Sequence, residues 1–163
     1  GTGNPGAGNT FREVGKKEGF LVLVVDSAKG YLSMLTAVLI FLMDGNWLIL
    51  VAVFSIIGHL YSVFTKFKGG GGLATLIGIS LYLIPKSIFL GAIPCIILLV
   101  LISDAVWASI VGFIIAAIAD LVIFQYPQAR IISILAMGIV LLIRMLIMEY
   151  FKTKRRKTIG ETI

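Results

Sequence analysis

Long apolar runs separated by short polar breaks dominate the chain. Runs that approach about 20 residues are typical of helices that cross a membrane. Leu73–Ile84 is shorter, and its 12 residues are too few to cross a full bilayer without tilting. We therefore expect an all-α, polytopic membrane helix bundle of about six spans. The apolar segments are Gly19–Met43, Trp47–Phe64, Leu73–Ile84, Ser87–Ile102, Ala105–Phe124 and Ile131–Met148.

Composition indicates the same class of protein. The 163 residues are 59% hydrophobic and only 13% charged, with a mean hydropathy of +1.06. A soluble domain of this size does not need so many apolar side chains, so we expect a single membrane domain over residues 1–163. One cysteine, Cys95, and one histidine predict neither a disulfide framework nor a bound transition metal.

Basic residues indicate how the helices are oriented. Of the 14 Lys and Arg residues, ten fall in segments assigned to one side of the membrane, two on the other side and two inside spans. We interpret the net charge of +6 as this positive-inside signal, and expect no nucleic acid partner. The two glycine-rich segments, 1–18 and 58–75, and the basic tail, 152–163, are then all cytoplasmic. Because the chain begins with glycine, we expect a fragment or processed form lacking an upstream helix.

The second glycine-rich segment, Gly58–Thr75, reads GHLYSVFTKFKGGGGLAT. Its four consecutive glycines offer backbone N–H groups where the next helix begins, and the positive end of the helix dipole lies at the same place. Lys66 and Lys68 add positive charge just before them. The segment therefore predicts an anion site, with a flexible hinge between two membrane helices as the structural alternative.

The first glycine-rich segment completes no common nucleotide motif. Gly1–Gly6 has the spacing GxGxxG, but no strand precedes it, and the tetraglycine lacks the Lys-Ser/Thr of a P-loop. What remains is a second backbone-rich anion loop. Several polar side chains suit phosphate oxygens by charge and geometry: Thr2, Asn4, Asn9, Arg12 and Thr75. We assign Lys16 and Lys17 instead to lipid headgroups.

Three of the titratable residues in or near the spans are candidates for the site. Asp26 and Lys29 are three residues apart on one helix face, so Lys29 either pairs with Asp26 or faces the site. His59 lies near the cytoplasmic end of its span, shortly before the glycines. This position favours substrate contact or proton transfer, whereas a structural histidine is the plain alternative.

Taken together, these segments are similar to motifs of the bacterial inner-membrane acyl-phosphate:glycerol-3-phosphate acyltransferase family. GTGNPGAGNTFR at Gly1–Arg12 resembles the first family motif, DSAKG at Asp26–Gly30 follows it, and Gly58–Thr75 resembles the second motif. The likeness covers nearly the whole chain. It implies an all-helical protein of about seven spans, the first of them in the absent upstream piece, with a cytoplasmic active site.

The resemblance also implies a reaction and its residues. A fatty acyl group moves from acyl phosphate to the 1-hydroxyl of glycerol 3-phosphate, giving lysophosphatidic acid without a metal, a cofactor or an acyl-enzyme. Membrane lipids are the remaining partners. His59 would be catalytic. The residues that contact substrate would be Thr2, Asn4, Asn9, Arg12, Lys29, Lys68, Gly69, Gly70, Gly72 and Thr75.

The chain departs from the family pattern at several positions. The second motif normally carries a lysine where this chain has Gly71, which removes a cation beside two anionic substrates. The third, C-terminal motif is weak, with Thr153 near its asparagine position and Gly160-Glu161 only loosely similar to its ending. Serine, threonine and proline are usual at three further positions, which here are Thr2, Gly8 and Ser62.

These departures keep a second function open. The alternative is a paralogue with a weakened site, which binds acyl phosphate, phospholipid or another phosphate ester without turning it over. A small transporter is a third interpretation, but the charges inside spans are few and no inverted repeat is visible. Of the three, the sequence favours the acyltransferase.

Overall fold

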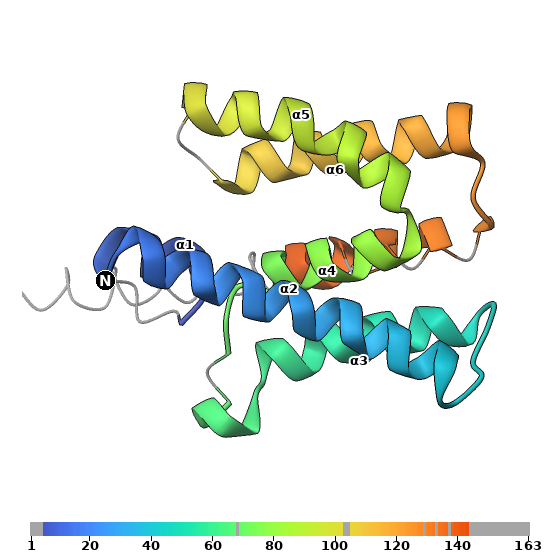
Figure 1. Ribbon diagram of the computed structural model, residues 1–163, viewed down its shortest axis with the longest axis horizontal. Coiled ribbons are helices and arrows are strands. Elements are labelled where there is room, and N and C mark those ends of the chain that lie inside the picture. Colours follow the sequence, from blue (N-terminus) through green and yellow to red (C-terminus); the bar gives the residue numbers. More distant parts are fainter. Residues whose placement is uncertain are drawn as a thin grey trace, which may run out of the picture.

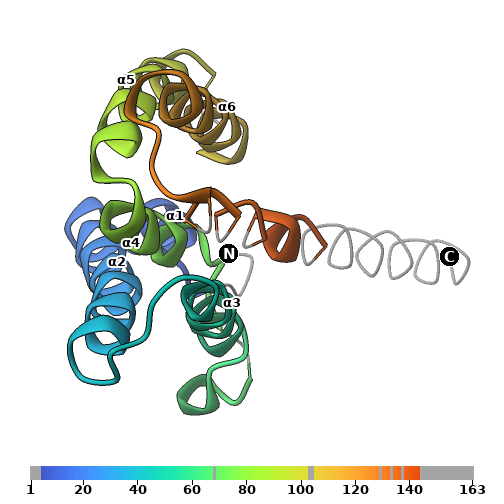
Figure 2. The same ribbon diagram turned by 90° about the vertical axis from the view of Figure 1, so that its right-hand side faces the viewer.

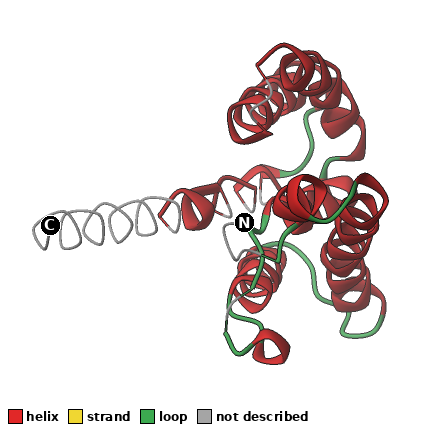
Figure 3. Cartoon of the chain, turned by 90° about the vertical axis from the view of Figure 1, so that its left-hand side faces the viewer, coloured by secondary structure: helices red, strands yellow, loops and turns green. Residues whose placement is uncertain are grey.

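The computed structural model describes residues 5–67, 69–102, 105–128, 130–132, 134–136 and 138–143. Every element in this part of the chain is helical, as predicted (Figure 3). The elements are α1 (Ala7–Glu13), α2 (Lys16–Leu39), α3 (Trp47–Leu60), the 3₁₀ turn η1 (Val63–Thr65), α4 (Leu73–Leu83), α5 (Pro85–Ile102), α6 (Ala105–Ala119) and the π-helical turn η2 (Asp120–Phe124). The described residues between Arg130 and Ile143 are helical as well.

Four helices in the described part are long and apolar enough to cross a membrane: Lys16–Leu39, Trp47–Thr65, Pro85–Ile102 and Trp107–Phe124. Two shorter apolar helices, Leu73–Leu83 and Arg130–Ile143, correspond to the third and sixth predicted segments. With 11 residues and a rise of about 1.5 Å each, α4 is only about 16 Å long, well short of the bilayer core. The basic tail, 152–163, lies outside the described residues.

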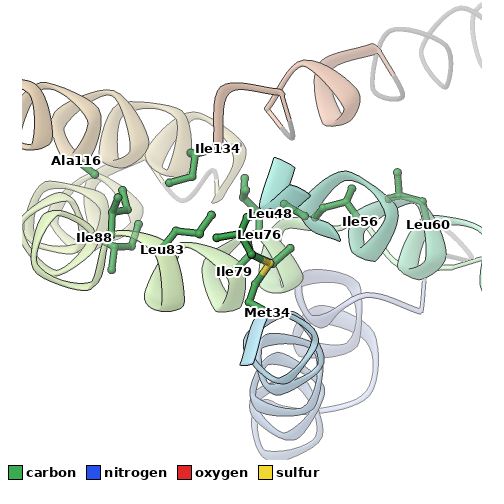
Figure 4. Packing of buried hydrophobic residues seen from close by; sticks show 12 residues of the cluster. Met34, Leu48, Ile56, Leu60, Leu76, Ile79, Leu83, Ile88, Ala116 and Ile134 are labelled. Carbon is green, nitrogen blue, oxygen red and sulfur yellow. The ribbon is translucent and has the colours of Figure 1, made fainter. Parts of the chain in front are cut away.

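The short helix α4 forms the centre of the bundle. Figure 1 shows it between α2 and α3 on one side and the α5–α6 pair on the other. Its residues Leu76, Ile79 and Leu83 are at most 4% exposed and belong to one hydrophobic cluster. Side chains from the surrounding helices complete this cluster (Figure 4), among them Met34, Leu48, Ile56, Leu60, Ile88 and Ile134. A helix buried on nearly all sides needs no polar face, which explains the continuous apolar run.

Glycines allow α2 and α4 to approach each other closely. A Cβ at Gly78 would overlap the backbone carbonyl of Ser27, and one at Gly30 would overlap the carbonyl oxygen of Thr75. The Ser27 hydroxyl donates a hydrogen bond to the Ala74 carbonyl oxygen at 3.0 Å across the same contact. Membrane helices have little hydrophobic drive to associate, so close backbone packing and interhelical hydrogen bonds hold this pair together.

Glycines also allow α5 and α6 to pack closely. A Cβ at Gly91 would overlap the carbonyl oxygen of Gly112, so the two backbones are in contact. At one end of the pair, the Ser87 hydroxyl donates to the Asp120 carboxylate at 3.1 Å, and both residues are fully buried. This hydrogen bond joins the first turn of α5 to the π-helical turn after α6.

Two local predictions need correction. The first glycine-rich segment is not entirely a loop, because Ala7–Glu13 form α1. The helix persists despite Gly8 because it packs on α2, where Gly19 lies directly against the Phe11 side chain. In addition, α5 begins at Pro85 rather than at Ser87. Proline suits the first turn of a helix, since its fixed φ is helical and the N–H that it lacks would have no partner there.

Candidate functional site

The buried carboxylate of Asp26, in α2, contacts two basic side chains, those of His59 and Lys29. The His59 Nδ1 atom lies 3.7 Å from Asp26 Oδ1, and each of the two side chains is only 9% exposed. The Lys29 ammonium donates to the same oxygen at 3.1 Å, and the Lys29 side chain remains 62% exposed. Of the two alternatives for Lys29, the structure shows the pairing with Asp26, and the exposed side chain is still open to an anion. His59 lies in the last turn of α3, so Asp26 also ties α2 to the end of α3.

The second glycine-rich segment folds back onto His59. The Gly69 N–H donates to the Leu60 carbonyl oxygen at 3.1 Å, which returns the chain to the end of α3. A Cβ at Gly69 would overlap the carbonyl oxygen of His59, and a Cβ at Gly70 would lie 2.5 Å from its Nε2 atom. A side chain at position 69 would therefore collide with the backbone of His59, and one at position 70 would have to displace the imidazole ring.

The first glycine-rich segment reaches the same place. A Cβ at Gly70 would also lie 3.4 Å from the Cα atom of Gly6, so the two segments meet at His59. Gly6 is the N-cap of α1, which carries Asn9 and Arg12. The Arg12 Nε atom donates to the Gly8 carbonyl oxygen at 3.2 Å, and its side chain is exposed. The structure thus brings together two segments that are remote in sequence.

The N-terminus of α4 closes this region. Its N-cap, Gly72, has φ +86°, a left-handed conformation that favours glycine. The first N–H groups of a helix have no intrahelical partner and carry the positive end of its dipole, so they suit an anion. Thr75, in the first turn of α4, is 1% exposed, and its Oγ1 atom has no hydrogen-bond partner among the described residues.

The predicted site residues that the structure describes fall into three groups. His59, Gly69 and Gly70 are in contact, and Lys29 joins them through Asp26. Gly72 and Thr75 lie at the start of α4, while Asn9 and Arg12 lie on α1. Thr2, Asn4 and Lys68 are outside the described residues. Across the described chain, no group of three His, Cys, Asp or Glu side chains is placed to hold a metal ion.

Sequence reasoning missed the link between Asp26 and His59. It paired Asp26 only with Lys29, because helical spacing reveals neighbours within one helix and not between helices. A usable signal was present, however. An acid inside a membrane span needs a partner, and the chain has one histidine at the end of the next span.

An open groove of about 590 Å³ begins at Lys29 and runs along α2. Apolar and small side chains line it: Leu32, Ser33, Thr36, Ala37, Phe41, Met43 and Val51. From Lys29 to Ala37 the helix rises about 12 Å. The groove lies on the outside of the bundle, where Leu32 is 54% and Phe41 is 64% exposed, and it extends from Lys29 toward the turn between α2 and α3.

Comparison with known proteins identifies the family. A family model described as "Glycerol-3-phosphate acyltransferase" matches residues 1–157. The chain belongs to the glycerol-3-phosphate acyltransferase family. A protein of that name from Ehrlichia canis is 35% identical over 159 residues, covering 96% of this chain and 81% of the relative. Another from Trichlorobacter lovleyi is 40% identical over 149 residues, covering 87% of this chain and 73% of the relative.

Solved structures of this acyltransferase family agree with the fold. The chain is similar to PlsY (YgiH), an integral membrane glycerol 3-phosphate acyltransferase, in its lysophosphatidic acid form. The TM-score is 0.79 at 31% identity, covering 94% of this chain and 79% of that one. The glycerol 3-phosphate form gives a TM-score of 0.78 at 31% identity, covering 98% and 77%. The family resemblance and the polytopic membrane fold are thereby confirmed.

Proposed function

We propose that this protein transfers a fatty acyl group from acyl phosphate to the 1-hydroxyl of glycerol 3-phosphate, giving lysophosphatidic acid. The observation that carries this proposal is the meeting of both glycine-rich segments at His59, which is itself held by Asp26. Two substrates that each bear a phosphate need two backbone-rich anion sites, and the reaction needs them side by side. The similar PlsY has been solved in glycerol 3-phosphate and lysophosphatidic acid forms.

In this proposal the reacting groups meet beside His59. The glycerol hydroxyl attacks the acyl carbonyl carbon, a C–O ester bond forms, and the bond from the acyl carbon to the phosphate oxygen breaks. His59 accepts the proton of the attacking hydroxyl, and Asp26, 3.7 Å away, stabilises the resulting imidazolium. Inorganic phosphate leaves. The α4 N-terminus, Arg12 and Lys29 stabilise phosphate charge.

The groove beside Lys29 suits the acyl chain of the donor. Its lining is mainly apolar and it begins at an exposed ammonium, as a chain with an anionic head requires. We place the site on the cytoplasmic side of a bacterial inner membrane, since most of the basic residues fall on that side. The protein then draws its donor from the membrane and glycerol 3-phosphate from the cytoplasm.

Gly71 supports a second candidate, a paralogue that binds acyl phosphate without turnover. The position is exposed and lacks the lysine that the family motif normally carries there. The test is acyl transfer from palmitoyl phosphate to labelled glycerol 3-phosphate by the protein in lipid, beside an Arg12→Ala variant. Turnover that collapses in the variant supports the acyltransferase. Binding of palmitoyl phosphate without any turnover overturns it in favour of the paralogue.

A further inference from the structure

The chain between α3 and the glycines forms a compact closed loop. We call residues Ser62–Phe67 the interfacial loop. Its ends are tied together, because the Phe67 N–H donates to the Ser62 carbonyl oxygen at 2.9 Å. Just outside it, the bond from Gly69 N–H to the Leu60 carbonyl oxygen closes a wider ring at 3.1 Å. The loop is thus a defined structure that adjoins His59 at one end and the tetraglycine at the other.

Three large apolar side chains of this loop do not contribute to the protein core. Val63 is 71% exposed, Phe64 is 100% exposed and Phe67 is 64% exposed. All three lie beyond the end of α3 at Leu60, in the 3₁₀ turn η1 and just after it, where the candidate span Trp47–Thr65 ends. In water, such a cluster would be costly and prone to association, so it needs a covering surface.

The direction of the loop indicates what covers it. In Figure 1, the green turn that follows α3 lies beyond the end of this helix and is displaced away from the rest of the bundle. Figure 2, seen along the bundle, places the same turn outside α3 at the periphery. Because the candidate span Trp47–Thr65 ends within this loop, the loop lies at the boundary between headgroups and lipid tails.

The backbone and the charge of the loop fit that location. Lys66 and Phe67 have φ values of +52° and +61°, a left-handed conformation that is unusual for non-glycine residues and is costly unless the surroundings hold it. Lys66 is exposed beside the apolar cluster. A cation next to aromatic side chains is the combination that binds the interface of membranes with anionic lipids.

We propose that the interfacial loop inserts Val63, Phe64 and Phe67 into the leaflet on the side of the site, while Lys66 contacts anionic lipid headgroups. The loop then holds the junction of His59 and Gly69 at the depth of lipid headgroups, where an amphiphilic donor presents its own head. This inference requires only that the chain spans a membrane. It does not depend on the proposed reaction.

The test places a fluorescent reporter on the loop. Phe64→Trp is made in a Trp47→Phe, Trp107→Phe background and reconstituted in vesicles of phosphatidylcholine and phosphatidylglycerol. Phe89→Trp in the same background is the control, because Phe89 is 66% exposed on the spanning helix α5. We expect a blue-shifted emission for Phe64→Trp, quenching by lipids brominated near the headgroup, and protection from aqueous iodide.

Other outcomes would overturn the proposal. Strong iodide quenching without bromolipid quenching would put the loop in water. Protection from both quenchers that grows with protein density would show that a second copy covers it. Adding Lys66→Gln to the reporter variant should shift the emission toward the red in the anionic vesicles and leave it unchanged in pure phosphatidylcholine. An equal shift of the emission in both lipids would show that Lys66 does not contact anionic headgroups.

Discussion

Asp26 and His59, from neighbouring helices, meet with Asp26 Oδ1 and His59 Nδ1 3.7 Å apart in a nearly buried contact. The same carboxylate binds the more exposed Lys29 ammonium, so it neutralises a positive charge inside the membrane bundle. It also orients the His59 ring. This arrangement makes Asp26 a positioning residue in the proposed reaction, because it acts through His59.

Replacing Asp26 should therefore impair the reaction more than the fold. We expect Asp26→Asn to lower kcat/KM for acyl transfer by about 100-fold, a typical contribution of an oriented proton acceptor. His59→Gln should have a similar effect. The double variant should be hardly worse than either single one, since residues that act as a unit are not additive. Additive losses would show that the two residues act independently. Unfolding of Asp26→Asn in detergent would assign Asp26 a structural role.

The contact of Gly70 with the imidazole leads to a second prediction. A methyl group at this position would lie 2.5 Å from His59 Nε2, so Gly70→Ala must displace the ring. A displacement of about 1 Å in a site can cost about 100-fold in rate, and we expect a loss of that order in kcat/KM.

Gly58→Ala is the matched control for that experiment. Gly58 lies in α3 one residue before His59, and a Cβ there would meet nothing within 4 Å. The control should keep full activity and gain about 0.5–1 kcal/mol of stability, because alanine is the better helix former. If both variants retain activity, the close approach of Gly70 to His59 has no catalytic meaning.

The exposed position 71 allows a gain-of-function experiment. A lysine there would supply a charge-assisted contact to substrate phosphate, worth about 1.5–3 kcal/mol, or about 10- to 100-fold in kcat/KM. We expect Gly71→Lys to raise turnover and to lower the KM for glycerol 3-phosphate or acyl phosphate. Gly71→Gln, similar in length but uncharged, should give much less. Equal rates for the unchanged protein and both variants would mean that other cations already contact the substrate phosphate.

The packing of α2 on α4 can be tested through stability. Because a Cβ at Gly78 would overlap the Ser27 carbonyl, Gly78→Ala should push the two helices apart and destabilise the fold by about 1–3 kcal/mol. Thermal unfolding in detergent measures this loss. Gly138→Ala is the control, since a Cβ at this helical position has nothing within 4 Å and, as at Gly58, should leave the melting temperature unchanged or slightly raised.

The hydrogen bond between Ser87 and Asp120 predicts a smaller effect. Ser87→Ala removes the donor to a fully buried carboxylate, and interhelical hydrogen bonds in membranes are worth about 0.6–1.7 kcal/mol. We expect a lower unfolding temperature with an unchanged KM, because the pair lies on α5 and η2 rather than near His59. A large change in KM would instead connect this end of the bundle to the site.

Much of this protein was predictable from the order of its residues. Apolar runs located the helices, because in a bilayer each backbone polar group must be satisfied within its own helix. Helical spacing allowed the pairing of Asp26 with Lys29 as one of two alternatives, and the two glycine motifs indicated the family. The helix over Ala7–Glu13 escaped prediction, since its stability comes from packing on α2 rather than from its own glycine-rich composition.

Sequence alone determined the helical membrane class and the family, since both depend on local composition and on motifs within single segments. Only the tertiary structure decided which of these segments meet. It brought Gly6 and Gly70 together at His59, paired His59 with Asp26, and left Phe64 fully exposed on a loop beside the site. These contacts arise from how the helices pack around α4, and that packing depends on side chains distributed over the whole chain.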